Sequence, residues 1–363
     1  MRAKVRSSAM RAVGALVIAL GMGTVVPATA HANQTPTDLK VMTRNLYLGA
    51  DLTPALVATD TASFLGAVAM IYGTAQFTDF PARAEALADE IQSGDPDLVG
   101  LQEVTVWETS GPGVPKTQDF LAILQDELSA RGLHYAVASV SDNANIGPVP
   151  LVSPCAPDTP VGACLVTLKD RDVVLVNEDT PSLYWWGARN RDYTAQQEFT
   201  PPVPGAAPIS FKRGWASIEA SYRGERFRFV NTHLETESFP AVQEAQAAEF
   251  LAGPARSWGP VIVTGDFNSA ADGSTTTTYA TLTQRFRDAW WTQPGDKGLT
   301  CCQSGTLTNP ASQLSTRIDL VLGRNGAYPI SAKVLGATPF QAAPPLWASD
   351  HAGVVATVRL SWW

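Results

Sequence analysis

The feature that most constrains this sequence is a set of short apolar runs that end in polar, potentially reactive side chains. In "VIVTGDFNSA" (261–270), Val261, Ile262 and Val263 are typical of a buried strand, and Asp266 and Asn268 follow at once. A carboxylate at the end of a buried strand is costly unless it is paired or bound to a cation. This run therefore predicts a strand whose end points into a polar site.

The same pattern recurs in five other runs, each of which places an acid, an amide or an imidazole near one end. Six such ends suggest that they converge on one metal and phosphate site. Carboxylates, amides and imidazoles suit a hard cation and acid–base chemistry, whereas the GxSxG motif of a serine hydrolase is absent. The five runs are 39–46, 97–104, 226–234, 317–323 and 352–360, the last preceded by Asp350 and His351.

The first 32 residues have the pattern of a secretory signal peptide. Basic residues precede an apolar stretch, 12–26, and Ala30-His31-Ala32 supplies a cleavage site after Ala32. The alternative, a membrane anchor, is disfavoured because the stretch is short and contains three glycines. Cleavage removes four of the 26 basic residues and none of the 34 acidic ones, so the net charge moves from −8 to −12. We expect a secreted, acidic protein without stable membrane insertion.

After a short tail (33–38), we interpret 39–363 as one domain, because no linker or internal repeat divides it. Further strands are expected at 134–140, 172–177 and 215–222, where Ala216, Ile218, Ala220 and Tyr222 share one face. Helices are expected at 81–93, 117–131 and 240–252. The segments 105–117, 141–165 and 178–212 are rich in Pro, Gly, Ser and Asn and are interpreted as long surface loops.

Four cysteines lie in the exported part, which favours disulfides. The simplest pairing joins Cys155 to Cys164 and Cys301 to Cys302, although crossed pairing remains open. Neither pair has the CxxC spacing of a zinc site.

Seven motifs in a fixed order resemble the endonuclease/exonuclease/phosphatase superfamily, which includes pancreatic-type deoxyribonuclease and bacterial sphingomyelinases. The resemblance covers nearly the whole mature chain. It implies a four-layer αββα sandwich of the α+β class, in which two mixed β-sheets pack face to face with helices outside. The motifs are Asn45, "GLQEV" (100–104), "KRGW" (212–215), "NTHL" (231–234), "GDFNS" (265–269), "RIDLVL" (317–322) and "SDHAGV" (349–354).

The resemblance also implies a role for each motif residue. Glu103 would be the principal Mg²⁺ ligand, with Asn45 and Asp350 near the metal; Mn²⁺ or Ca²⁺ are alternatives. Asp266 and His351 would share the acid–base work. Asp319 would orient His351, and Asn268 and Arg213 would bind the phosphate. His233 would be a second imidazole near the leaving group.

We therefore expect a Mg²⁺-dependent phosphodiesterase that acts as a monomer, with an extracellular nuclease as the leading function. One alternative is a sphingomyelinase-type enzyme acting on a phospholipid headgroup, and another is a catalytically silent binding relative. The segment 182–193 contains Tyr184, Trp185 and Trp186 beside two arginines. Such residues suit a lipid interface or base stacking, although a loop that packs its aromatic rings onto the domain is the simpler interpretation.

Overall fold

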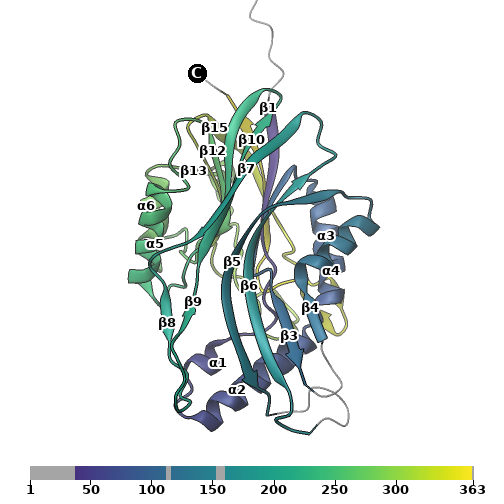
Figure 1. The fold of residues 1–363 in the computed structure, drawn as a ribbon. Coiled ribbons are helices and arrows are strands. Elements are labelled where there is room, and N and C mark those ends of the chain that lie inside the picture. Colours follow the sequence, from purple (N-terminus) through teal and green to yellow (C-terminus); the bar gives the residue numbers. More distant parts are fainter. Residues whose placement is uncertain (1–36, 112–115, 153–159, 362–363) are drawn as a thin grey trace, which may run out of the picture. The chain divides into compact units, whose positions relative to one another are not determined.

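Two mixed β-sheets lie face to face in the computed structural model, which describes residues 37–111, 116–152 and 160–361 (Figure 1). The predicted signal peptide lies outside these residues. In each sheet one pair of neighbouring strands is parallel and the other pairs are antiparallel. The strands of the first sheet, in order across it, are β15 (Ala327–Leu335), β18 (Gly353–Leu360), β1 (Thr37–Asn45), β2 (Leu98–Gln102), β6 (Leu165–Asn177), β3 (Val106–Ser110) and β4 (Lys116–Asp119). Strand β5 (Tyr135–Pro150) also pairs with β6.

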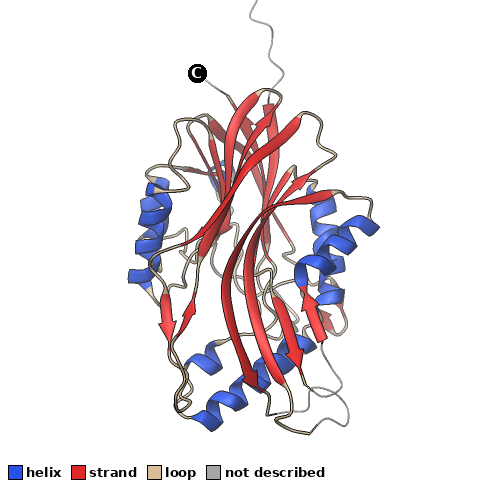
Figure 2. Ribbon diagram, in the orientation of Figure 1, coloured by secondary structure: helices blue, strands red, loops and turns tan. Residues whose placement is uncertain are grey.

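The second sheet has six strands, and helices cover the outer face of both sheets (Figure 2). Its order is β13 (Arg287–Asp288), β14 (Asp319–Arg324), β12 (Val261–Asp266), β11 (Glu225–His233), β10 (Gly214–Tyr222) and β7 (Leu183–Asp192). The helices are α1 (Thr53–Leu56), α2 (Thr61–Phe77), α3 (Phe80–Gly94), α4 (Phe120–Ala130), α5 (Pro240–Ala252), α6 (Thr278–Thr283) and the short 3-10 helix η1 (Ala289–Thr292). Two small hairpins complete the fold: β8 (Gln197–Phe199) with β9 (Ile209–Phe211), and β16 (Gln341–Ala342) with β17 (Pro345–Leu346).

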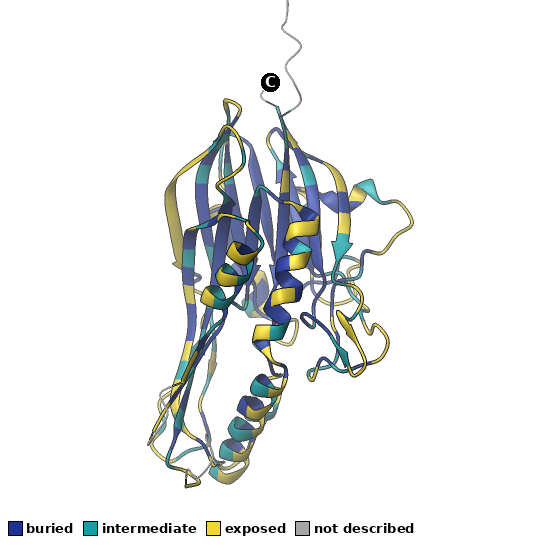
Figure 3. Ribbon diagram, turned by 90° about the vertical axis from the view of Figure 1, so that its right-hand side faces the viewer, coloured by how far each residue is buried: buried dark blue, intermediate teal, exposed yellow. Residues whose placement is uncertain are grey.

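Alternate side chains of the central strands enter different apolar cores, which explains their unbroken apolar runs. On β6, Val173 and Leu175 face the helices, while Val174 and Val176 face the second sheet. On β12, Ile262 belongs to the core between the sheets, and Val263 belongs to the core beneath α5 and α6. In Figure 3 the strands are mostly buried, whereas the helices in front of them carry many exposed positions. These layers confirm the predicted αββα sandwich.

The elements predicted from hydrophobic spacing agree well with the structure. All nine predicted strands are present, and the residues of β10 predicted to share a face all enter the core between the sheets. Helix α5 has the predicted bounds, whereas α4 begins three residues late because 116–119 form β4. Strand β1 begins at Thr37, so the last two residues assigned to the tail belong to the sheet.

The interpretation of three segments as surface loops is wrong. Strand β3 lies within 105–117 and β4 begins in it, β5 continues to Pro150, and 178–212 contains β7, β8 and β9. Strand β5 tolerates its Pro and Gly residues because its pairing with β6 is interrupted between Ile146 and Val149, where Pro148 lies. The aromatic residues at 184–186 therefore lie on an edge strand and are 38–69% exposed. They do not pack back onto the domain as a loop.

Candidate active site

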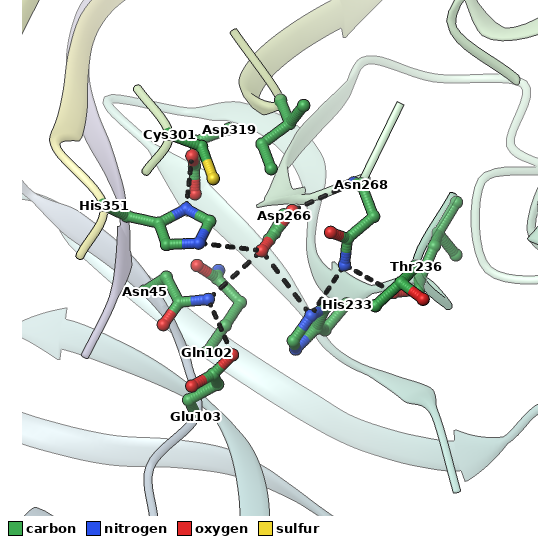
Figure 4. Close-up of polar contacts among 12 residues, drawn as sticks. Asn45, Gln102, Glu103, His233, Thr236, Asp266, Asn268, Cys301, Asp319 and His351 are labelled. Atoms are coloured by element: carbon green, nitrogen blue, oxygen red, sulfur yellow. Dashed lines mark hydrogen bonds and ion pairs between the residues drawn. The ribbon is translucent and has the colours of Figure 1, made fainter. Parts of the chain in front are cut away.

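The polar residues at the ends of three neighbouring strands lie side by side in one row across the second sheet. His233 at the end of β11 is paired in register with Asp266 at the end of β12, and Asp266 is paired with Asp319 at the start of β14. In the first sheet, Asn45 at the end of β1 is in register with Gln102, which precedes Glu103. The two sheets place these ends opposite one another, so the predicted convergence is present (Figure 4).

The side chain of Asp266 lies at the centre of the site and is fully buried. Its Oδ2 accepts a hydrogen bond from Asn45 Nδ2 at 3.1 Å, and it lies 3.5 Å from His233 Nε2 and 3.8 Å from His351 Nε2. Its Oδ1 accepts from the backbone N–H of Asn268 at 2.9 Å. Burial, together with the Asp319 carboxylate, raises the pKa of Asp266 to about 7. A carboxyl group with this pKa is suited to proton transfer near neutral pH.

His351 and Asp319 form a buried pair. The Nδ1 atom of His351 lies 2.8 Å from Asp319 Oδ2, which fixes the ring so that Nε2 points toward Asp266. Burial alone would lower the pKa of His351, but the carboxylates of Asp319, Asp350 and Asp266 outweigh it and hold the pKa well above its usual range. His351 is therefore a charged group, and its Nε2 proton is directed toward Asp266.

The second histidine has the opposite electrostatic character. Burial, with the charges of Arg213 and His351, lowers the pKa of His233 well below its usual range. Arg213 Nη1 lies 2.9 Å from His233 Nδ1, and because a guanidinium only donates, Nδ1 accepts and the ring proton is on Nε2. The side chain of Asn268 donates to the carbonyl of Leu234 at 3.0 Å and lies 3.1 Å from His233 Nε2. Arg213, His233 and Asn268 thus form one side of the site.

The predicted metal ligands lie on the other side, toward the first sheet. Glu103 accepts hydrogen bonds from Asn45 Nδ2 at 3.2 Å and from the backbone N–H of Leu48 at 2.8 Å. Burial raises the pKa of Asp350 to about 7, and Glu103 adds to this rise while His351 opposes it. Glu103 and Asp350 both line a cleft of about 810 Å³.

This donor set fits a divalent cation. Two half-buried carboxylates and an amide that lie close together favour a compensating positive charge, and an oxygen-rich set of Glu, Asp and Asn suits Mg²⁺, Mn²⁺ or Ca²⁺. Among the described residues, however, the most compact groups of possible metal-binding atoms do not include the predicted ligands Glu103, Asn45 and Asp350. In each of them the donor atoms lie within 4.8 Å of one another: Asp266, Asp319 and His351 form one group, and Cys301, Cys302 and His351 the other.

Cys301 and Cys302 form the predicted vicinal disulfide at the edge of the cleft. The sulfur of Cys302 lies 4.0 Å from His351 Nε2 and lines the cleft, so this bridge is part of the wall beside His351. Cys164 is also disulfide-bonded. Its predicted partner, Cys155, lies outside the described residues.

Two buried arginines, which the motif analysis did not single out, support the loops that carry the site. Arg83 on α3 donates to the carbonyls of Leu46, Tyr47 and Ala348 at 2.6–3.1 Å. Arg44 donates to the carbonyl of His351 at 2.6 Å. Both arginines therefore fix backbone next to Asn45 and Asp350.

Two buried acids on β6 were also missed. Burial and the charge of Glu103 raise the pKa of Asp170 to about 7, and burial with Asp170 raises that of Asp172 well above its usual range. Asn143 donates to Asp172 at 2.9 Å. The signal was present in the sequence, since "LKDRDVV" places two acids directly before an apolar run, as "SDHAGV" does.

The polar pair of Gln102 and Asn231 lies between the sheets behind the site. Gln102 Nε2 donates to Asn231 Oδ1 at 2.6 Å, and Asn231 Nδ2 donates to the carbonyl of Leu101 at 2.8 Å. A Cβ atom at Gly100 would lie 2.1 Å from Thr264 Oγ1 and 2.4 Å from Asn231 Oδ1. The glycine of "GLQEV" is therefore required by the close approach of the two sheets, and Gln102 and Asn231 have a structural role.

Comparison with known proteins identifies the family and agrees with the fold. The model of the Endonuclease/Exonuclease/phosphatase family matches residues 63–351. Among solved structures, a family member from Bacteroides thetaiotaomicron is 16% identical with a TM-score of 0.55, over 90% of this chain and 96% of that one. A family member from Beutenbergia cavernae is 21% identical with a TM-score of 0.54, over 89% and 72%.

A mannosyl-6-phosphatase from Bacteroides thetaiotaomicron is also similar, at 17% identity and a TM-score of 0.52, over 88% of this chain and 99% of that one. At these identities the solved structures establish the fold alone. No curated protein matches the sequence.

Proposed function

Because the chain belongs to the endonuclease/exonuclease/phosphatase family, whose members are metal-dependent phosphoester hydrolases, we propose that it is an exported, Mg²⁺-dependent phosphodiesterase. The observation that carries the proposal is the position of Asp266 Oδ2. This one oxygen lies within 4 Å of Asn45, His233 and His351, which come from both sheets and are far apart in sequence. A structural cap at the end of a strand does not require such a convergence.

The proposed roles follow from the electrostatics. Glu103, Asn45 and Asp350 would hold the cation, which would offset negative charge on the phosphoryl oxygens when bound. Asp266 would accept a proton from the attacking water, as its pKa near neutrality permits. His351, charged and fixed by Asp319, would donate to the phosphate or to the leaving oxygen.

On the opposite side, Arg213 would contact the phosphate as a permanent cation. Asn268 and neutral His233 would orient the phosphate oxygens and the leaving group through hydrogen bonds. All predicted positions carry groups able to perform these roles, which argues against the silent relative.

The sequence predicts nucleic acid as the substrate, and an extracellular nuclease stays the first candidate. The acidic balance of the chain gives no general attraction for a polyanion. The cleft itself is lined by five acids (Asp51, Glu103, Glu235, Glu237 and Asp350) and by Arg213. A phospholipid phosphodiesterase is favoured as the second candidate by a specific observation: the cleft shares a wall with an apolar groove.

The signal-peptide pattern of residues 1–32 supports export with cleavage after Ala32, and we propose that the enzyme acts as a monomer. Among the described residues, no helix is both long and apolar enough to cross a bilayer.

The test is an assay of the purified chain with Mg²⁺ or EDTA on plasmid DNA, RNA, sphingomyelin and bis-p-nitrophenyl phosphate. Glu103→Gln and His351→Ala should each lower kcat/KM by about 100-fold or more, because each removes a group that acts on the transition state. Glu108→Gln and His134→Ala, at partly exposed positions, are matched controls and should retain activity. Wild-type rates in either site variant, or no turnover by the wild type, would refute the proposed site.

A further inference from the structure

An apolar groove adjoins the candidate catalytic cleft. Helices α1 and α2 and the β8–β9 hairpin form part of its wall, and strands β3, β5 and β6 of the first sheet form the rest. Leu52, Leu56, Phe199 and Phe211 line both the groove and the cleft. All four are half-buried and apolar, so the boundary between the two spaces consists of apolar side chains.

Every residue that lines the groove is apolar. Trp107 extends into its wall with its indole N–H already donated to the carbonyl of Leu48 at 2.8 Å, so the ring offers only apolar surface. Thr61 Oγ1 donates to the carbonyl of Pro202 at 2.8 Å, which ties the start of α2 to the segment joining β8 and β9. These hydrogen bonds hold the walls of the groove in place.

The size of the groove limits what it can hold. Its free volume is about 60 Å³, against about 810 Å³ for the cleft. A space of this size takes about four water molecules, or a comparable run of methylene groups. Because an all-apolar space offers water no partners, a hydrocarbon segment suits it better than solvent.

Helix α2, which forms one wall of the groove, also exposes apolar side chains on its outer side. None of its 17 residues is charged, and Met70 and Phe77 are 54% and 62% exposed. Val57, just before this helix, is 67% exposed. An uncharged helix that exposes apolar side chains beside an apolar groove suits contact with a lipid aggregate.

We infer that the groove binds the first part of the hydrocarbon chain of an amphipathic phosphodiester whose phosphate lies at Asp266 and Arg213. The inference rests on the proposed phosphodiesterase function and assigns its substrate class. The shared lining supports it, because only apolar side chains such as Leu56 and Phe211 lie between the cleft and the groove, and a hydrocarbon chain attached to the bound phosphodiester would contact them on its way. A nucleic acid offers no such group.

A homologous series of p-nitrophenyl alkyl phosphates, from methyl to octyl, tests the inference with the full chain and Mg²⁺. Release of p-nitrophenolate reports turnover while the alkyl group stays on the phosphate. Each methylene that enters the groove should raise kcat/KM by up to about fourfold. The increase should reach at least tenfold by hexyl and then level off, since only a short segment fits.

Two tryptophan variants on α2 distinguish the effect of filling the groove from the effect of changing the outer surface of the helix. Val68→Trp fills the groove and should reduce the hexyl-to-methyl ratio of kcat/KM to near one while the methyl substrate reacts as before. Met70→Trp points outward and should leave both values unchanged. If Val68→Trp does not fold, Ile146→Trp fills the groove from β5 and serves the same purpose.

The outcomes distinguish the two proposals. Turnover of every member at one rate, or a ratio unchanged by the filling variants, would overturn the groove assignment and leave the phosphodiesterase intact. No turnover of any member would overturn the phosphodiesterase, and the groove assignment with it.

Discussion

The buried amide of Asn231 should be a major determinant of stability, because it joins the two sheets behind the site. Between the sheets, its side chain accepts a hydrogen bond from Gln102 at 2.6 Å and donates to the carbonyls of Leu101 and Val173 at 2.8 and 3.2 Å. At about 1 kcal/mol each, these bonds contribute about 3 kcal/mol. Asn231→Ala also leaves buried partners unsatisfied and opens a small void, so we expect a loss of about 3–5 kcal/mol in the free energy of unfolding.

Urea unfolding at pH 7 in EDTA, followed by tryptophan fluorescence, measures this loss. The midpoint should fall while the m-value stays constant, since the same surface is exposed on unfolding. Ser221→Ala on the same sheet, at a half-buried position near the end of β10, is the control and should change stability by less than about 0.5 kcal/mol. A loss below about 1 kcal/mol for Asn231→Ala would show that this amide does not join the sheets as inferred.

Two further predictions concern buried carboxylates. Asp319→Asn should lower kcat/KM by about 100-fold or more with little loss of folding, because His351 loses the charge that fixes and protonates it; a threefold effect in steady-state assays would contradict this. The pKa of Asp172 is raised by burial and by Asp170, so its contribution to stability is full below the unfolded pKa near 3.8 and is lost as pH rises through the folded pKa. Asp172→Asn should therefore gain stability relative to the wild type between pH 4 and pH 8, measured by urea unfolding in EDTA; a gain that shrinks with pH would refute the assignment.

Most of the central sheets could be predicted from sequence for a physical reason. Their strands are buried on both faces, so the apolar runs are continuous and end sharply, as 261–263 does before Asp266. The polar residues at those ends are informative because burying them demands partners. The convergence of Asn45, His233 and His351 on Asp266 follows from strand register. The register could not be predicted because it depends on pairing between strands that are distant in sequence.

The peripheral elements could not be predicted because their signals are weak or misleading. Helix α2 is apolar on several sides and lacks the alternation that marks a surface helix. Strand β5 contains Gly147 and Pro148, which are typical of loops, and its long pairing with β6 depends on a partner distant in sequence. The motif residues alone also gave no indication of Asp170, although the rule applied to the other acids would have found it.

These two groups of elements divide the work of the molecule. The strand ends hold Glu103, Asp266 and His351 through register and through inter-sheet bonds, so the chemistry depends on the rigid sandwich. The groove, in contrast, is formed by α1, α2 and the β8–β9 hairpin against β3, β5 and β6, and it shares only a few side chains with the cleft. Because substrate selection is built from elements that hold none of the proposed catalytic groups, changes there should alter the preferred alcohol without altering the hydrolysis of a minimal phosphodiester. The chain-length series measures this separation, since only the groove responds to the added methylenes.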